Sequence, residues 1–197
     1  MLIFEIFLDH TRMQVKDTIE QYEQVIHDCK DIFIKKTKDY GTSWRVYRTI
    51  SIADQIYIKA KRIRTIQEKG EQRIGDTIGS EFRGILNYGI IGMMQLQLET
   101  AAPEELDAVA VGLHYNRIAE MAKALMLDKN HDYGEAWREM SQESFVDLIL
   151  SKLQRIRQII GNEGKTLISE GIDANFLDII NYAVFALILI GEGKHDA

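Results

Sequence analysis

The chain of 197 residues carries one motif twice. Residues 38–45, with the sequence KDYGTSWR, return 93 positions later as HDYGEAWR at residues 131–138. When residues 38–69 are aligned with residues 131–162 without a gap, 13 of the 32 positions are identical. This degree of identity indicates a tandem duplication, so we expect one structural unit to be built twice. Polar residues that remain in both copies while their neighbours changed are the first candidates for function.

Helical periodicity is visible throughout the first copy. Apolar residues at three- and four-residue spacing predict a helix over residues 15–38. Ser51 with Asp54 three positions later is typical of a capping pair, and it predicts the start of a second helix that ends at Gly70. The pattern predicts a third helix over residues 74–99.

The second copy repeats this plan. A proline in the first turn followed by acidic residues predicts a helix over residues 103–129. Ser144 with Asp147 predicts the start of the next helix, as Ser51 with Asp54 does in the first copy. We interpret Asp54 and Asp147 as capping residues rather than as metal ligands. The last helix is expected after Ser169, up to about residue 190, with its register shifted by one relative to the first copy.

These helices predict an all-α fold. We expect a poorly defined N-terminal extension at residues 1–14, a three-helix repeat at residues 15–99 and a second at residues 103–191. Three short helices leave an apolar face exposed, so the two repeats are expected to pack about a pseudo-twofold axis as one six-helix bundle.

Composition excludes several classes of protein. A formal net charge of −6 and a pI near 5.4 argue against a general nucleic-acid binder. A single cysteine, Cys29, provides neither a disulfide framework nor a thiolate metal site, and it favours a reducing, cytoplasmic setting. The start of the chain lacks the features of a signal peptide, and the apolar run at residues 183–190 is too short to span a bilayer. We therefore expect a monomer or homodimer without a membrane association.

The repeated loop motif supplies one set of candidates. A helix that stops at glycine explains the Tyr-Gly pair, but it does not require the aspartate and the arginine that flank it. Either these two form a local ion pair that closes the loop, or they bind a ligand. The residues concerned are Asp132, Tyr133, Trp137 and Arg138, with Asp39 and Arg45 in the first copy.

Two cations recur on the second helix of each copy. Lys59 and Arg62 return as Lys152 and Arg155, and a separation of three places both on one helix face. Their retention implies a fixed partner, which is either a carboxylate of the neighbouring helix or a bound phosphate.

The last helix of each copy contains a polar stripe. Asn175, Asp178 and Asn181 correspond to Glu81, Gly84 and Asn87, so each copy lacks a carboxylate that the other has. Polar groups within an apolar helix need partners, so the stripe is either an interhelical hydrogen-bond network or a ligand site, and Asn181 is a candidate ligand-binding residue. Three carboxylates, those of Glu170, Asp173 and Asp178, are the candidate ligands for one Mg²⁺.

Several segments of the chain resemble a known family. KNHDYGEAWREM, SFVDLILSKLQRIRQI and SEGIDANFLDIINYAVFAL look like the nucleotide modification associated domain of the first type, and KDYGTSWR, SIADQIYIKAKRIRTI and NYGIIGMMQL look like a weaker first copy. The resemblance covers nearly all of residues 29–190 and implies a place in the handling of modified nucleotides, with no reaction attached to it. The segment from Asn175 to Phe185 is more distantly similar to all-α nucleoside triphosphate pyrophosphohydrolases of the MazG and dimeric dUTPase kind. Asparagine replaces the first glutamate of their Glu-x-x-Asp pair here, and their Glu-x-x-Glu helix is missing.

Three hypotheses follow. The first is a nucleotide-handling protein whose ligand lies between the halves. Lys152, Arg155 and Arg138 would bind the phosphates, and a Mg²⁺ ion would bridge these phosphates. If the protein is catalytic, a metal-bound water would attack a phosphoanhydride. The second is a non-catalytic nucleotide-binding module. The third is a structural bundle in which every retained polar residue is a cap or an interhelical pair.

Overall fold

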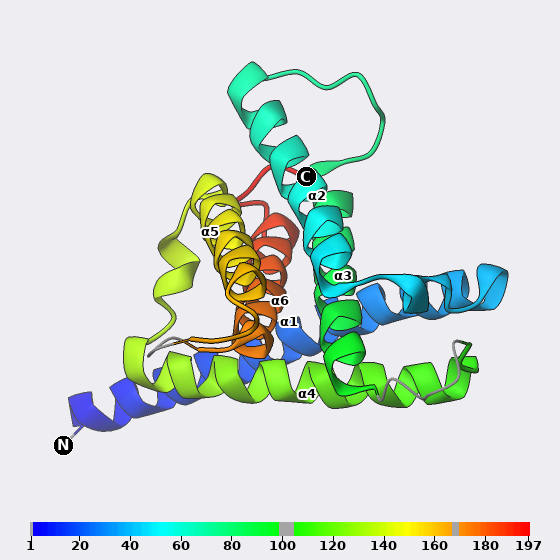
Figure 1. Cartoon of the computed structure of the whole chain (residues 1–197). Coiled ribbons are helices and arrows are strands. Elements are labelled where there is room, and N and C mark those ends of the chain that lie inside the picture. The colour runs from blue at the N-terminus through cyan, green and yellow to red at the C-terminus, as the bar shows by residue number, and fades with distance from the viewer. Residues whose placement is uncertain (1, 99–104, 167–169) are drawn as a thin grey trace.

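The computed structural model of the protein describes residues 2–98, 105–166 and 170–197, with side chains from residue 17 onward. The all-α prediction is confirmed, because these residues form six α-helices and two short 3-10 turns and contain no strand (Figure 1). Each copy contributes three α-helices with a 3-10 turn between the first and the second. The boundary predicted near residue 100 lies outside the described residues.

The first copy contains α1 (Leu2–Tyr40), η1 (Ser43–Val46), α2 (Thr49–Lys69) and α3 (Ile78–Gln97). Helix α1 therefore includes most of the segment that we expected to be an extension. The predicted cap of α2 is wrong: its N-cap is Arg48, without a side-chain cap, and Ser51 lies inside the first turn. Helix α3 begins four residues later than predicted, because the hydroxyl of Thr77 accepts a hydrogen bond from the backbone N–H of Ser80 and caps the helix there.

The second copy contains α4 (Ala108–Tyr133), η2 (Ala136–Glu139), α5 (Gln142–Gly161) and α6 (Ile172–Gly191). Helix α4 is capped by Asp107, whose carboxylate accepts from two backbone N–H groups at 2.8 Å, so the predicted start at residue 103 is wrong. The cap of α5 is Ser141, which accepts from the N–H of Ser144, and Ser144 is therefore not the cap.

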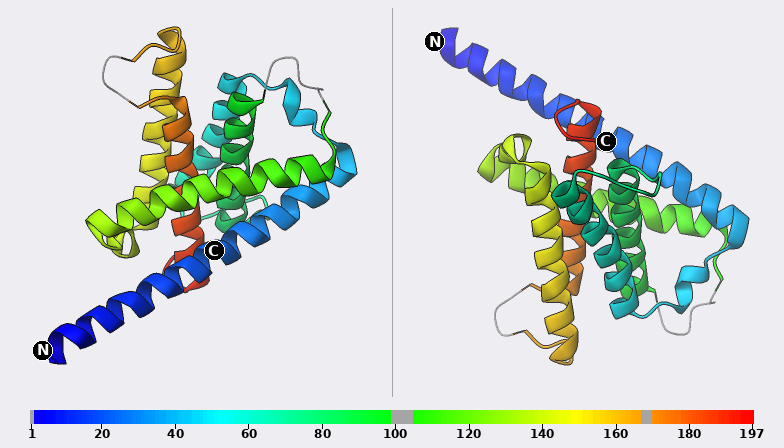
Figure 2. Two further views of the ribbon diagram at one scale, coloured as in Figure 1. Left: turned by 90° about the horizontal axis from the view of Figure 1, so that it is seen from below. Right: turned by 90° about the horizontal axis from the view of Figure 1, so that it is seen from above.

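The helices form a core of four with two more across one end. Helices α2, α3, α5 and α6 run alongside one another, while α1 and α4 lie across the lower end of this group (Figure 1). The views from below and above show α1 and α4 crossing the ends of the other helices (Figure 2). Within a copy α2 packs on α3 and α5 on α6, and the copies meet through α3 against α6 and α2 against α5.

Hydrogen bonds between the copies occur in pairs in which the two copies exchange donor and acceptor roles, as expected for a pseudo-twofold axis. The Tyr22 hydroxyl of the first copy donates to Asn181 Oδ1 at 2.8 Å, and its counterpart Tyr115 donates to Asn87 Oδ1 at 2.9 Å. The amide groups of these asparagines continue the pattern, since Asn87 donates to the carbonyl of Cys29 and Asn181 to that of the corresponding residue, Ala122. Asn181 therefore belongs to the interhelical network.

Ion pairs between α2 and α5 obey the same exchange. Arg157 lies 2.7 Å from Asp54, and Arg64, which corresponds to Arg157, pairs with Asp147. The capping role that the sequence suggested for both aspartates is wrong, because their carboxylates face the other copy instead of their own helix start. The signal for these pairs was present in the sequence, since both the arginine and the aspartate recur at the same repeat positions.

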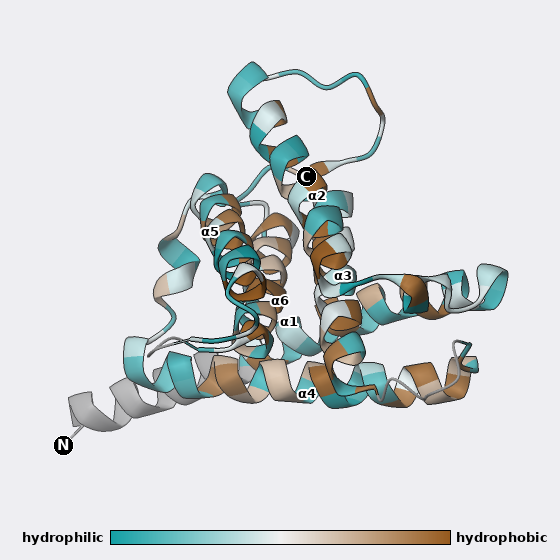
Figure 3. Ribbon diagram, in the orientation of Figure 1, coloured by the Kyte–Doolittle hydropathy of each residue, from teal (hydrophilic) through white to brown (hydrophobic). Residues whose placement is uncertain are grey.

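The apolar core lies where the copies meet. Apolar residues are concentrated on α3 and α6 (Figure 3), and thirteen residues of α6 are buried. Within the described part of the chain, α6 is the one helix long and apolar enough to cross a membrane, but 72% of that stretch is buried inside the protein. Its hydropathy is thus that of a core helix.

Candidate functional site

The repeated loop motif buries its tryptophan and exposes its other aromatic residue. Trp44 and Trp137 are 7% and 6% exposed, and Trp137 stacks on Phe185 with ring centroids 4.3 Å apart. Tyr133 is 75% exposed, and Asp39 and Asp132 are exposed too, with Asp132 contacting only the neighbouring His131 among the described residues. Each tryptophan therefore anchors its loop to the core.

The arginine of the motif has structural partners in both copies. Arg138 forms an ion pair with Glu135 at 2.5 Å and with Glu192 at 2.7 Å, and it lies over the ring of Trp137. Arg45 donates to the side-chain oxygen of Gln95, whose amide group in turn donates to backbone carbonyls of η1 and Tyr47. Both arginines hold the loop against the bundle, but neither pairs with the aspartate of its motif, so the predicted local aspartate–arginine ion pair is wrong.

The two cations of α2 share one carboxylate. Lys59 Nζ lies 3.1 Å from Glu81 Oε2, and Arg62 pairs with Glu81 Oε1. Arg62 also donates to the carbonyl oxygens of Ile74 and Asp76, at 3.1 and 2.9 Å. The side chain of Glu81 is 7% exposed, so this cluster compensates a nearly buried charge.

The cations of α5 are arranged differently. Asp178 Oδ2 lies 2.5 Å from Lys152 Nζ, and Asp178 Oδ1 lies 2.5 Å from Nζ of Lys129 on α4. Arg155, the counterpart of Arg62, is exposed and has no ion-pair or hydrogen-bond partner in the described part of the protein. Arg138 and Arg155 line different cavities, so the structure does not gather the predicted copy-two ligand set in one place.

The predicted metal set is not assembled either. Asp178 is buried between two lysines, whereas Asp173 and Glu170 are exposed. No group of three His, Cys, Asp or Glu side chains among the described residues could hold a metal ion. The structure therefore does not bring Glu170, Asp173 and Asp178 together as one group of metal ligands.

The first copy contains a cavity that combines cationic and aromatic side chains. It has a volume of about 400 Å³ and lies between α1, η1, α2 and α3. Its wall includes three cations, Lys36, Lys59 and Arg83, and five aromatic side chains, those of Phe33, Tyr40, Trp44, Tyr47 and Tyr88.

One residue pair explains why the cavity is open in this copy. In the alignment of the two repeats, Gly84 corresponds to Asp178, Lys36 to Lys129 and Lys59 to Lys152. In the second copy the Asp178 carboxylate fills the position between the two lysines. In the first copy both lysines remain, but Gly84 supplies no carboxylate, and a Cβ atom there would lie 2.6 Å from Lys59 Cε. In the first copy Lys59 pairs instead with Glu81, about one turn earlier on α3, so Lys36 is the lysine of this pair that has no carboxylate partner among the described residues.

The side chains that line the cavity carry three positive charges and two negative ones, those of Asp76 and Glu81, and the resulting net charge of +1 favours an anion. Lys36 and Arg83 are exposed and have no ion-pair partner in the part of the chain that the structure describes, and Arg83 has only Leu177 as its counterpart in the second copy. Burial, together with neighbouring Tyr47 and Tyr40, raises the pKa of Tyr88, so its hydroxyl stays protonated near neutral pH and can donate a hydrogen bond. Burial and the nearby Asp178 carboxylate raise the pKa of its counterpart Tyr182 to about 12.

Sequence reasoning selected Lys59 but missed Lys36 and Arg83. Lys36 lies two positions before the aligned motif, and its repeat as Lys129 was detectable by extending the alignment. The sequence did show that Gly84 lacks the carboxylate of Asp178, but not that two lysines contact this carboxylate in the second copy.

Comparison with known proteins identifies the repeated unit. Residues 36–96 and residues 129–190 each match the family model described as Nucleotide modification associated domain 1. No curated protein and no solved structure matches the chain. The likeness to all-α pyrophosphohydrolases therefore rests on the residues alone.

Proposed function

The chain belongs to the Nucleotide modification associated domain 1 family, in two tandem copies, and on this premise we propose that it is a nucleotide-binding module. The ligand occupies the cavity of the first copy, with its phosphate between Lys36 and Lys59. The observation that carries this proposal is the replacement of Asp178 by Gly84 between an otherwise retained pair of lysines.

The contacts of the Asp178 carboxylate indicate how the corresponding lysines of the first copy would bind a phosphate. Its two oxygens each accept from one lysine at 2.5 Å, which is within the range of charge-assisted hydrogen bonds. A phosphate oxygen can accept from Lys36 and Lys59 in the same way, and Arg83 on the cavity wall adds a third positive charge. Arg62 is occupied by Glu81 and holds Lys59 in place through that shared carboxylate.

The aromatic wall offers surfaces for the base and sugar. Tyr40 is 61% exposed at the cavity, while Trp44 is buried against Phe33 with ring centroids 6.5 Å apart. Stacking of a base on an exposed aromatic ring contributes about 1–3 kcal/mol, so Tyr40 is the residue proposed to contact the base.

The test is a calorimetric titration with canonical and modified nucleoside mono-, di- and triphosphates, with Mg²⁺ and with chelator. Lys36→Ala is expected to weaken binding at least tenfold, because loss of a charge-assisted hydrogen bond costs about 1.5–3 kcal/mol. Lys35→Ala is the matched control, since the neighbouring Lys35 pairs with Asp31 at 2.6 Å and does not line the cavity. Release of phosphate or pyrophosphate in the same samples reports on catalysis.

A second variant supplies the missing carboxylate. Gly84→Asp is expected to fold, because the nearest atoms that its Cβ would meet, 2.6–3.0 Å away, belong to the flexible end of Lys59, and its carboxylate should compete with the ligand and abolish binding. Gly84→Asn has nearly the same size without the charge, so it should bind more strongly than Gly84→Asp. The proposal is wrong if no nucleotide binds, or if the affinity is indifferent to Lys36→Ala and Gly84→Asp.

A further inference from the structure

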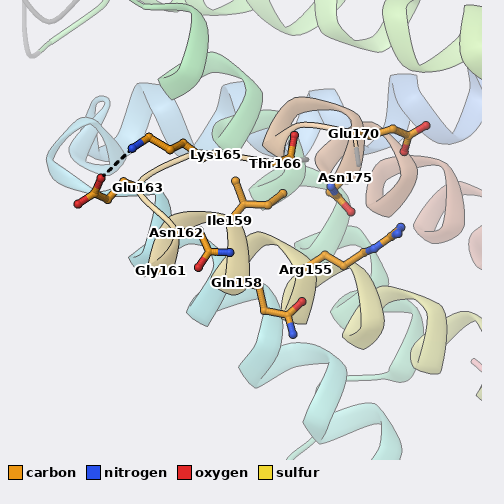
Figure 4. Close-up of a pocket in the computed structure, with 10 residues that line it drawn as sticks. All are labelled: Arg155, Gln158, Ile159, Gly161, Asn162, Glu163, Lys165, Thr166, Glu170 and Asn175. Carbon is orange, nitrogen blue, oxygen red and sulfur yellow. Dashed lines mark hydrogen bonds and ion pairs between the residues drawn. The ribbon is translucent and has the colours of Figure 1, made fainter. Parts of the chain in front are cut away.

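A second cavity lies in the other copy, between the end of α5 and the start of α6 (Figure 4). It has a volume of about 660 Å³, and its described lining is polar apart from Ile159. No aromatic side chain lines it, so it differs in character from the cavity of the first copy. Three groups in this lining have no protein partner among the described residues, two of them exposed charges and one a buried acceptor.

The first of these groups is the guanidinium of Arg155. Its counterpart Arg62 is held by the Glu81 carboxylate and two backbone carbonyls, but Asn175 stands in place of Glu81 in the second copy. Arg155 is left exposed, without an ion pair or hydrogen bond in the described residues. In the first copy the equivalent Arg62 donates to the Glu81 carboxylate, so a carboxylate is the partner that suits Arg155.

The second group is the side-chain oxygen of Asn175. This residue is 1% exposed, and its Nδ2 donates to the carbonyl oxygen of Gly171 at 2.7 Å. Because a carbonyl can only accept, this bond fixes the orientation of the amide, and Oδ1 has no donor within the described part of the chain. A buried acceptor without a donor costs about 1–3 kcal/mol, so the site is completed by a group that carries N–H or O–H.

The third group is the Glu170 carboxylate, which is exposed and forms no ion pair among the described residues. In Figure 4 it lies on the same side of the cavity as Arg155, with Asn175 between them. The opposite side contains Lys165 and Glu163, which neutralise each other at 3.3 Å. The unmet groups are therefore one cation, one carboxylate and one buried hydrogen-bond acceptor.

We propose that this cavity binds a small zwitterion, a free α-amino acid. Its carboxylate takes the place of Glu81 at Arg155, where the planar guanidinium can donate two parallel hydrogen bonds. Its ammonium group donates to Asn175 Oδ1 and pairs with Glu170. The inference does not depend on the nucleotide site, because it rests on a different cavity and on residues of the other copy.

The test uses the full-length protein and the twenty free amino acids, first by thermal shift and then by calorimetry. At least one amino acid should bind, and its amidated and its N-acetylated forms, which lack the carboxylate and the ammonium charge respectively, should bind at least tenfold more weakly. Arg155→Ala and Glu170→Gln should each reduce affinity at least tenfold. Lys165→Ala is the matched control on the same cavity, and it should leave affinity within twofold of the original protein.

Three outcomes would overturn the inference: no amino acid binds at millimolar concentration, the blocked forms bind as well as the free ones, or Arg155→Ala leaves the affinity unchanged. Binding of inorganic phosphate that depends on Arg155 but not on Glu170 would also overturn it, because the site would then select an anion. Lys36→Ala and Gly84→Asp should not affect amino-acid binding, which separates failure here from failure of the nucleotide proposal.

Discussion

A single side chain, present at Asp178 and absent at Gly84, separates a filled site from an open one. The carboxylate of Asp178 is 4% exposed and is the shared partner of Lys129 and Lys152. Without it, two ammonium groups would face each other next to an apolar core. The residue that the sequence suggested as a metal ligand therefore stabilises the fold.

Asp178→Asn is expected to lower the free energy of unfolding by about 3 kcal/mol, since removal of one partner leaves buried charges uncompensated. Lys129 is 43% exposed and can turn toward water, which keeps the loss below the upper end of that range. Asp173→Asn, on the exposed first turn of the same helix, should cost less than 1 kcal/mol. Urea denaturation followed by circular dichroism measures both values, and equal losses would contradict this assignment.

At the scale of helices, two polar contacts position α1 and α4 across the end of the bundle. Tyr22 ties α1 to α6, and Tyr115 ties α4 to α3, each through an asparagine of the opposite copy. Both tyrosines are buried, and burial raises their pKa values well above the usual range, so each hydroxyl remains a donor. These contacts fix which end of α3 and α6 is covered.

Tyr22→Phe is expected to destabilise the protein by about 1–3 kcal/mol, because it leaves Asn181 Oδ1 buried without a donor. Tyr115→Phe should cost less, since Asn87 is only partly buried.

The ion pairs between α2 and α5 are more exposed, so a double-mutant cycle on Arg157 and Asp54 should give a coupling below about 1 kcal/mol. A coupling larger than the Tyr22→Phe loss would reverse this ranking.

In the whole molecule, the two copies are arranged like the two subunits of a homodimer joined in one chain. The tyrosine–asparagine hydrogen bonds and the arginine–aspartate ion pairs between the copies each have a counterpart with the roles exchanged. The ion pair of Lys123 with Glu23 has none, because Asn116 stands at the position of Glu23 in the second copy. The second copy alone has Tyr115 with Asn181 and Arg157 with Asp147, and two such copies related by a twofold axis could satisfy them in trans.

Residues 105–197 expressed alone are therefore expected to form a helical homodimer, and to lose helix on dilution as the apolar faces of α5 and α6 become exposed. Light scattering coupled to size-exclusion chromatography measures the mass, and circular dichroism measures the helix content. Asp147→Arg in this fragment should weaken the dimer by placing two arginines opposite each other. A stable folded monomer would contradict the interpretation of the fold.

The sequence by itself determined the duplication, the six helices and the faces that carry the paired cations, because repeat identity and apolar periodicity are local properties of the chain. It could not determine which partners those polar residues meet. Ser51 with Asp54 satisfies a local capping rule, yet Asp54 pairs with Arg157 of the other copy, 103 positions away in sequence. Likewise, only the tertiary structure showed that Asp178 lies between Lys129 and Lys152 while Gly84 leaves the same position open. Such contacts depend on how helices distant in the chain align in space, whereas repeat identity and periodicity can be read along the chain itself.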